Sequence, residues 1–151
     1  MITEDFVSFE IAKLLKEKGF DGKCTHCFAL DTNEIQNIYD DVTPGYSPLA
    51  PCDWNHITEE ESCQIGLSGW TNLSAPTLWV AMKWLREVHK MHVCISYTEE
   101  NNWAVEIQSY NGENYSVWKS TQLLGLNLKV GFDSHEEACE AAIRYCLENL
   151  I

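Results

Sequence analysis

The strongest constraint on the fold is the succession of apolar patterns over residues 76–151. Apolar residues first recur with helical spacing up to about His89, then alternate with polar residues as in β-strands, and finally recur with helical spacing again. The order helix–strand–strand–strand–helix predicts an α+β fold. We expect an antiparallel sheet of three to four strands with helices packed on one face.

The expected strands are separated by short turn sequences. Asn101-Asn102 can supply the first turn, and Asn111-Gly112 supplies the second. The stretch after the third strand contains enough alternation for one short additional strand. The strands are predicted at residues 92–98, 103–107, 115–119 and 126–132.

Two of the expected helices have clear start signals. Ser134 and Glu137 form a capping box at the start of the last helix. Ser74 is the predicted N-cap of the middle helix, with Pro76 in its first turn, where the missing N–H group costs nothing. The apolar face of the last helix is expected to consist of Cys139, Ala142, Ile143, Cys146, Leu147 and Leu150.

The chain is 151 residues long, with a mass of 17.3 kDa, so a single domain over residues 1–151 is expected. Its first helix is predicted over Ser8–Lys18 and ends at Gly19. Either Asp5 or Ser8 could cap the start of this helix, and the sequence leaves both open.

Residues 24–72 differ in character from the rest of the chain. They contain three of the four prolines and few periodic apolar positions. Thr58 and Glu61 form a capping-box pattern for a short helix, and short strands are expected near 27–30 and 35–39. We therefore expect an irregular, loop-rich segment within the single domain, called the acidic lobe below.

The charge balance is the most informative feature for function. The formal net charge is −13, and no Lys or Arg occurs between Lys23 and Lys83. The acidic residues of this interval allow two interpretations. They form either a solvated surface that keeps the protein from aggregating or a surface that docks a basic protein. Its carboxylates are Asp31, Glu34, Asp40, Asp41, Asp53, Glu59, Glu60 and Glu61.

The same charge excludes several classes of partner. Nucleic acids and anionic membranes would repel so acidic a protein. The helix–three strands–helix order is shared with double-stranded-RNA-binding domains, whose last helix opens with lysines. The corresponding stretch here, Ser134–Ala138, contains two glutamates and no lysine, so direct nucleic-acid binding through this face is not expected.

The six tryptophans add two candidates for partner binding. Trp54 and Trp70 lie in the acidic lobe, where an exposed indole could anchor a protein. The alternative, which the irregular sequence favours, is that they pack the lobe onto the rest of the domain. The other four are expected to be core or half-buried residues and are Trp79, Trp84, Trp103 and Trp118.

The cysteines allow a second type of function. Cys24 and Cys27 have the spacing of a zinc-binding pair, and Cys52 with His56 could complete the four ligands of a structural zinc site. Unreactive structural thiols are the simpler interpretation, and no cofactor is otherwise indicated. The sequence contains no catalytic motif with a nucleophile, a phosphate-binding loop or a metalloprotease signature, so an enzyme is not favoured.

Two features bear on the compartment. Residues 1–15 carry acidic residues where a signal peptide would be basic, and no apolar run is long enough to cross a membrane. Seven cysteines is an odd number, which is unusual for an exported disulfide scaffold. These features predict a cytoplasmic protein with reduced thiols.

Three segments carry a family resemblance, and they are residues 5–15, 73–87 and 134–143. Together they resemble a group of small uncharacterised proteins of phage-like and mobile elements from gut anaerobes. The resemblance implies expression in the cytoplasm of a bacterial host and brings no known activity.

These observations predict a protein-binding module that docks a basic host or phage protein through its acidic surface. The function expected of such a module is inhibition of a host nucleic-acid-handling protein. The alternatives are a small zinc-stabilised accessory protein and a phage structural or regulatory component.

Overall fold

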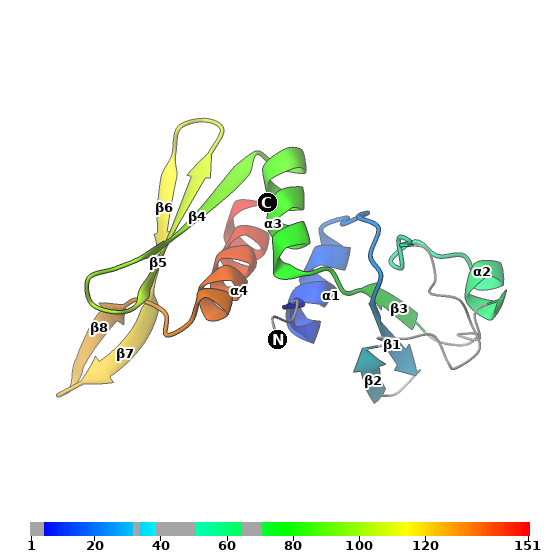
Figure 1. Cartoon of the computed structure of the whole chain (residues 1–151), viewed down its shortest axis with the longest axis horizontal. Helices are drawn as coiled ribbons and strands as arrows, with labels where there is room; N and C mark the ends of the chain where they lie inside the picture. Colours follow the sequence, from blue (N-terminus) through cyan, green and yellow to red (C-terminus); the bar gives the residue numbers. More distant parts are fainter. Residues whose placement is uncertain (1–4, 32–33, 39–50, 65–70) are drawn as a thin grey trace. The chain divides into compact units, whose positions relative to one another are not determined.

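The computed structural model describes residues 5–31, 34–38, 51–64 and 71–151 (Figure 1). It divides the chain into two compact units, unit 1 (Met1–Val80) and unit 2 (Ala81–Ile151). Helices are combined with three small antiparallel sheets, so the predicted α+β class is confirmed. The prediction of a single domain stays a prediction.

Unit 1 begins with helix α1 (Phe9–Glu17), close to the predicted range. Ser8 is the N-cap, because its side-chain oxygen accepts a hydrogen bond from the backbone N–H of Ile11. The helix ends in a Schellman motif, in which Phe20 N–H donates to the Leu15 carbonyl and Gly19 has a φ of +84°. The apolar face of α1 and the ring of Phe20 are buried in the core of this unit.

The rest of unit 1 contains a three-stranded antiparallel sheet. Strands β1 (Cys27–Asp31), β2 (Glu34–Ile38) and β3 (Thr71–Ser74) lie in the order β2-β1-β3. The two short strands expected in the acidic lobe are therefore present. A short helix, α2 (Glu59–Gln64), follows the predicted capping box.

The start of the middle helix differs from the prediction. Helix α3 (Leu78–Val88) begins after Thr77, whose hydroxyl accepts a hydrogen bond from the backbone N–H of Val80. Ser74 instead ends β3 and is fully buried. The reason is backbone pairing, because Ala75 N–H donates to the His26 carbonyl, which keeps the chain before the helix extended.

Unit 2 contains the predicted meander. Strands β4 (Met91–Tyr97), β5 (Trp103–Ser109) and β6 (Asn114–Val117) form an antiparallel sheet in that order. The register pairs apolar residues across the strands, with Val93 opposite Ile107 and Ile95 opposite Val105. The predicted alternation is thus confirmed.

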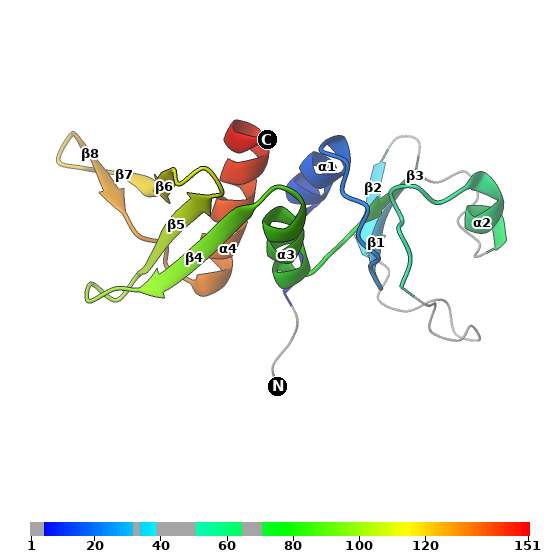
Figure 2. The same ribbon diagram turned by 90° about the horizontal axis from the view of Figure 1, so that it is seen from above.

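Helix α4 (His135–Tyr145) lies beside this sheet, as both views show (Figures 1 and 2). Its N-cap is Ser134, whose side chain accepts a hydrogen bond from Glu137 N–H. It continues as a π-helical turn, Cys146–Leu150. Of the six apolar positions predicted for its inner face, the five that are fully buried are Cys139, Ala142, Ile143, Cys146 and Leu147.

The additional strand of unit 2 is not a fourth member of the meander. Strands β7 (Lys119–Leu123) and β8 (Leu126–Val130) form a separate two-stranded hairpin. The hairpin is attached where Phe132 and Trp103 exchange backbone hydrogen bonds of 2.8 and 2.9 Å. Figures 1 and 2 show it extending beyond the β4-β5-β6 sheet.

The tryptophans expected in the core divide into two groups. Trp84 is buried, and Trp103 is partly buried in contact with other rings. Trp79 is 64% exposed, so the expectation of a core or half-buried position was wrong for this residue, and Trp118 is 42% exposed. Among the helices of the described residues, none has the length and hydropathy to cross a membrane.

Replacing Gly19 with alanine is expected to destabilise unit 1 by about 1 kcal/mol, because a Cβ atom is unfavourable at a positive φ. No atom outside the neighbouring residues lies within 4 Å of the added Cβ, so the loss is purely conformational. Urea unfolding measures it, with Glu17→Ala at an exposed site of α1 as the control. Equal stability of Gly19→Ala and the wild type would contradict the assigned helix end.

Candidate functional site

Two of the predicted zinc ligands are paired through their backbones in unit 1. Cys24 and Cys52 are antiparallel partners, joined by N–H···O hydrogen bonds of 2.8 and 3.1 Å. This pairing brings the segment 51–56 alongside the chain that leaves α1. The indole N–H of Trp54 then donates to the Cys24 carbonyl at 2.8 Å.

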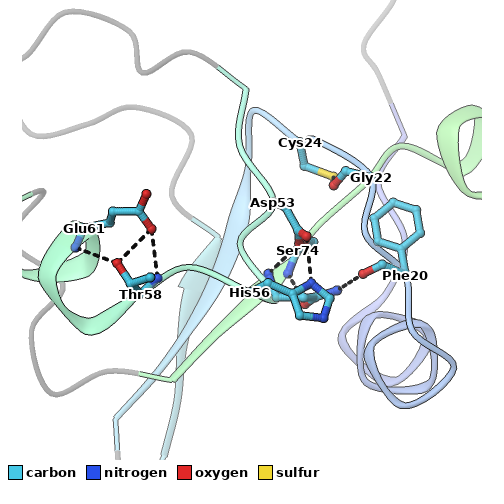
Figure 3. Close-up of polar contacts among 9 residues, drawn as sticks. Phe20, Gly22, Cys24, Asp53, His56, Thr58, Glu61 and Ser74 are labelled. Carbon is cyan, nitrogen blue, oxygen red and sulfur yellow. Dashed lines mark hydrogen bonds and ion pairs between the residues drawn. The ribbon is translucent and has the colours of Figure 1, made fainter.

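A polar clasp holds the same segment in place (Figure 3). The Asn55 amide nitrogen donates to the Phe20 carbonyl at 2.9 Å, and its carbonyl oxygen accepts the backbone N–H of Ser74 at 2.9 Å. The carboxylate of Asp53 accepts the backbone N–H of Asn55 at 3.1 Å and lies 2.7 Å from His56 Nδ1. Asn55 thus joins the end of α1 to the end of β3.

The thiols next to this clasp are protonated at neutral pH. Burial raises the pKa of Cys24 and of Cys27 to about 12, and the pKa of Cys52 to about 11. Proximity contributes too, since a negative charge on Cys52 would repel one on either of the other two thiols. A thiolate is the form that attacks substrates and binds metals, so these groups are poor nucleophiles.

The four predicted zinc ligands do not form a metal site. Among the described residues, which include Cys24, Cys27, Cys52 and His56, no three cysteine, histidine or carboxylate side chains are placed to hold a metal ion. His56 is exposed and is engaged with Asp53. Cys24-x-x-Cys27 leads into strand β1, not into a helix, so the geometry of a redox-active pair is also missing.

Where the structure describes side-chain exposure in the acidic lobe, the exposed carboxylates lie on α2. Glu59, Glu60 and Glu61 are consecutive, exposed and in the first helical turn. Glu61 accepts hydrogen bonds of 2.9 Å from both the backbone N–H and the hydroxyl of Thr58, and these contacts lower its pKa. The predicted capping box is therefore confirmed, and the three carboxylates also suit the positive end of the helix dipole.

These carboxylates form no ion pair within the described part of the chain. None of the ion pairs found there includes Glu59 or Glu60. The four basic residues of unit 1 all lie within residues 13–23, against thirteen acidic residues in the same unit. Unit 1 thus has a formal charge of −9, and the six basic and ten acidic residues of unit 2 give −4.

The remaining predicted residues divide into three cases. Asp31 and Glu34 are partners in the backbone register of β1 and β2. Trp54 is 4% exposed, so its indole packs unit 1 and offers no surface to a partner. The others, Asp40, Asp41 and Trp70, lie outside the described residues.

The clasp residue Asn55 was not singled out from the sequence. Asp53 and Asn55 are typical turn formers, which predicts the local turn but not its long-range role. The hydrogen bond to Phe20 spans 35 positions in the chain, and no local pattern encodes it.

Comparison with known proteins adds no family. No family model matches the chain, and no curated protein or solved structure is significantly similar to it. The resemblance to proteins of phage-like and mobile elements therefore stays a prediction.

Replacing Asn55 with alanine is expected to lower the free energy of unfolding by about 1–3 kcal/mol, because it leaves the partly buried Ser74 N–H and Phe20 carbonyl without a partner. Thermal unfolding of the variant measures this loss. Asn127→Ala, at an exposed position of β8, is the control and should stay within about 0.5 kcal/mol of the wild type. Equal losses in the two variants would show that Asn55 has no special role.

Alkaline pH is expected to destabilise the protein. Between about pH 9, where unfolded thiols titrate, and pH 12, the unfolded chain loses protons that the folded thiols of Cys24 and Cys27 retain. The free energy of unfolding therefore falls as pH rises, by up to about 1.4 kcal/mol per pH unit for each thiol. Urea unfolding from pH 8 to 11 measures the slope, which Cys27→Ala should make shallower; an unchanged slope would contradict the assignment.

Proposed function

We propose that this chain is a protein-binding module that docks a basic partner through the exposed carboxylates of unit 1. The observation that supports this most directly is the first turn of α2, where Glu59, Glu60 and Glu61 are three consecutive exposed carboxylates that form no ion pair among the described residues. Concentrated charge of one sign accelerates encounter with the opposite sign and favours a partner that brings the missing cations.

The way in which α2 is held supports the same proposal. The Cys24–Cys52 pairing and the Asn55 clasp fix the segment immediately before the helix. The capping box fixes its first turn, with Glu61 as the internal partner of Thr58. Of the three α2 carboxylates, Glu59 and Glu60 then remain available to a partner. Because the preceding segment is already fixed, little conformational entropy is lost when they bind.

The partner class that we propose is a protein with a basic surface, of the kind that nucleic-acid-handling proteins present to phosphates. An acidic surface that occupies such a site would compete with nucleic acid, which is the basis for proposing an inhibitor. The proposed setting is the cytoplasm of a bacterial host that carries a phage-like element, as the family resemblance implies.

The double substitution Glu59→Gln/Glu60→Gln is expected to weaken binding to a fluorescent lysine- and arginine-rich peptide by about threefold to tenfold at low salt. The matched control is Glu99→Gln/Glu100→Gln, which removes the same charge from an exposed turn of unit 2. Fluorescence anisotropy at 20 and 300 mM NaCl measures both affinities.

The proposal requires that the two variants differ. A local docking surface predicts a larger loss for the α2 variant and a shallower salt dependence of its residual binding. Equal losses in the two variants would mean that only net charge matters, and binding that is insensitive to salt would contradict an electrostatic surface altogether.

A further inference from the structure

The β7–β8 hairpin of unit 2 is amphipathic, and its apolar side is uncovered. The register places Leu123 opposite Leu126, Thr121 opposite Leu128, and Lys119 opposite Val130. Alternation puts all of these on one face, and the polar pairs Gln122–Asn127 and Ser120–Lys129 on the other. The exposed fractions of Leu123, Leu126 and Leu128 are 57, 64 and 37%.

A hairpin of this kind gains little stability on its own. An isolated two-stranded sheet is marginal in water, and an exposed apolar face on it adds nothing to folding. In the described part of the chain, both outer edges of the hairpin are also without a strand partner. The turn itself, Leu124-Gly125, has positive φ angles of 51° and 76° and projects a leucine that is 93% exposed.

The charge around this face suits contact with an identical surface. No acidic residue occurs between Glu113 and Asp133, although the whole chain has a net charge of −13. Lys119 is the one charged residue of the apolar face, and it pairs with Asp133 at 2.5 Å and with Glu137 at 3.3 Å. In a two-fold contact only the groups near the symmetry axis meet their own counterparts, and an uncompensated charge there would repel its copy. The pairing of Lys119 with Asp133 and Glu137 removes that repulsion from this face.

We propose that the Leu123–Leu126–Leu128 face of the β7–β8 hairpin is a self-association surface, through which two copies of this chain form a two-fold symmetric dimer. The leucines of the two hairpins bury one another, and the leucine-bearing turns add to the contact. Lys129 remains on the outer, solvated face. This inference does not depend on the proposed docking of a basic partner.

The test uses analytical ultracentrifugation of the full chain over about 5–500 μM, a range that covers the weak end of specific interfaces. We expect a monomer–dimer equilibrium that becomes tighter as NaCl is raised from 50 to 500 mM, because salt screens the repulsion between two acidic chains and leaves apolar burial intact. Docking to a basic peptide has the opposite salt dependence, so failure of one proposal is distinguishable from failure of the other.

The decisive variant is Leu126→Thr/Leu128→Thr, which removes apolar surface while keeping residues that favour strands. Two leucines are lost from each copy, so dimerisation should weaken at least about 100-fold. The matched control, Ser120→Thr/Gln122→Thr, changes the opposite face of the same hairpin and should dimerise as the wild type does. Near-UV circular dichroism and the melting temperature of monomeric samples check that both variants are folded.

Three outcomes would overturn the proposal. The first is a wild-type chain that stays monomeric at 500 μM in 500 mM NaCl. The second is a dimer that persists in Leu126→Thr/Leu128→Thr, or that the control variant loses equally. The third is a monomeric chain that co-sediments with phosphatidylcholine vesicles through these leucines, which would assign the face to a neutral lipid surface.

Discussion

The carboxamide of Asn55 is the contact on which the arrangement of unit 1 depends. A loop-rich segment has few ladder hydrogen bonds of its own, so its backbone polar groups must find partners elsewhere. Asn55 supplies both a donor and an acceptor, and it uses them on the end of α1 and the end of β3. The buried indole of Trp54 packs at the same junction, and its N–H group donates a hydrogen bond to the Cys24 carbonyl. Without these contacts the segment that leads into the acidic α2 would have no fixed place in unit 1.

This anchoring separates the chemistry of the thiols from that of the carboxylates. Cys24 and Cys27 are buried and Cys52 is partly buried, and this burial raises the pKa of each thiol, so they remain protonated and act as small apolar residues. The carboxylates of α2 remain exposed to water. The sequence suggested both a metal site and a charged surface. In the fold the carboxylates of that surface are accessible to solvent, whereas the thiols of Cys24 and Cys27 are buried.

The periodic parts of the fold were predictable from sequence, and the long-range polar contacts were not. The alternation of apolar and polar residues predicts β4 and β5, and the helical spacing of apolar residues predicts α4. Each pattern depends only on the local repeat of the backbone. The start of α3 was misplaced because Ser74 is a good cap in isolation, whereas the pairing of Ala75 with His26 is a tertiary effect. At the candidate site the capping box of Thr58 and Glu61 was predictable because the two residues are three positions apart. The Asn55 clasp was not, because it joins segments far apart in the chain.

The turn of the β7–β8 hairpin has a consequence for engineering. A leucine held at a φ of 51° sacrifices about 1 kcal/mol of backbone energy that asparagine, which tolerates the left-handed conformation, would largely recover. An asparagine at position 124 is therefore expected to stabilise the hairpin. The same exchange would replace the large apolar side chain with the highest exposed fraction among the described residues by a polar one, so it would raise thermal stability and weaken apolar contacts at the same position.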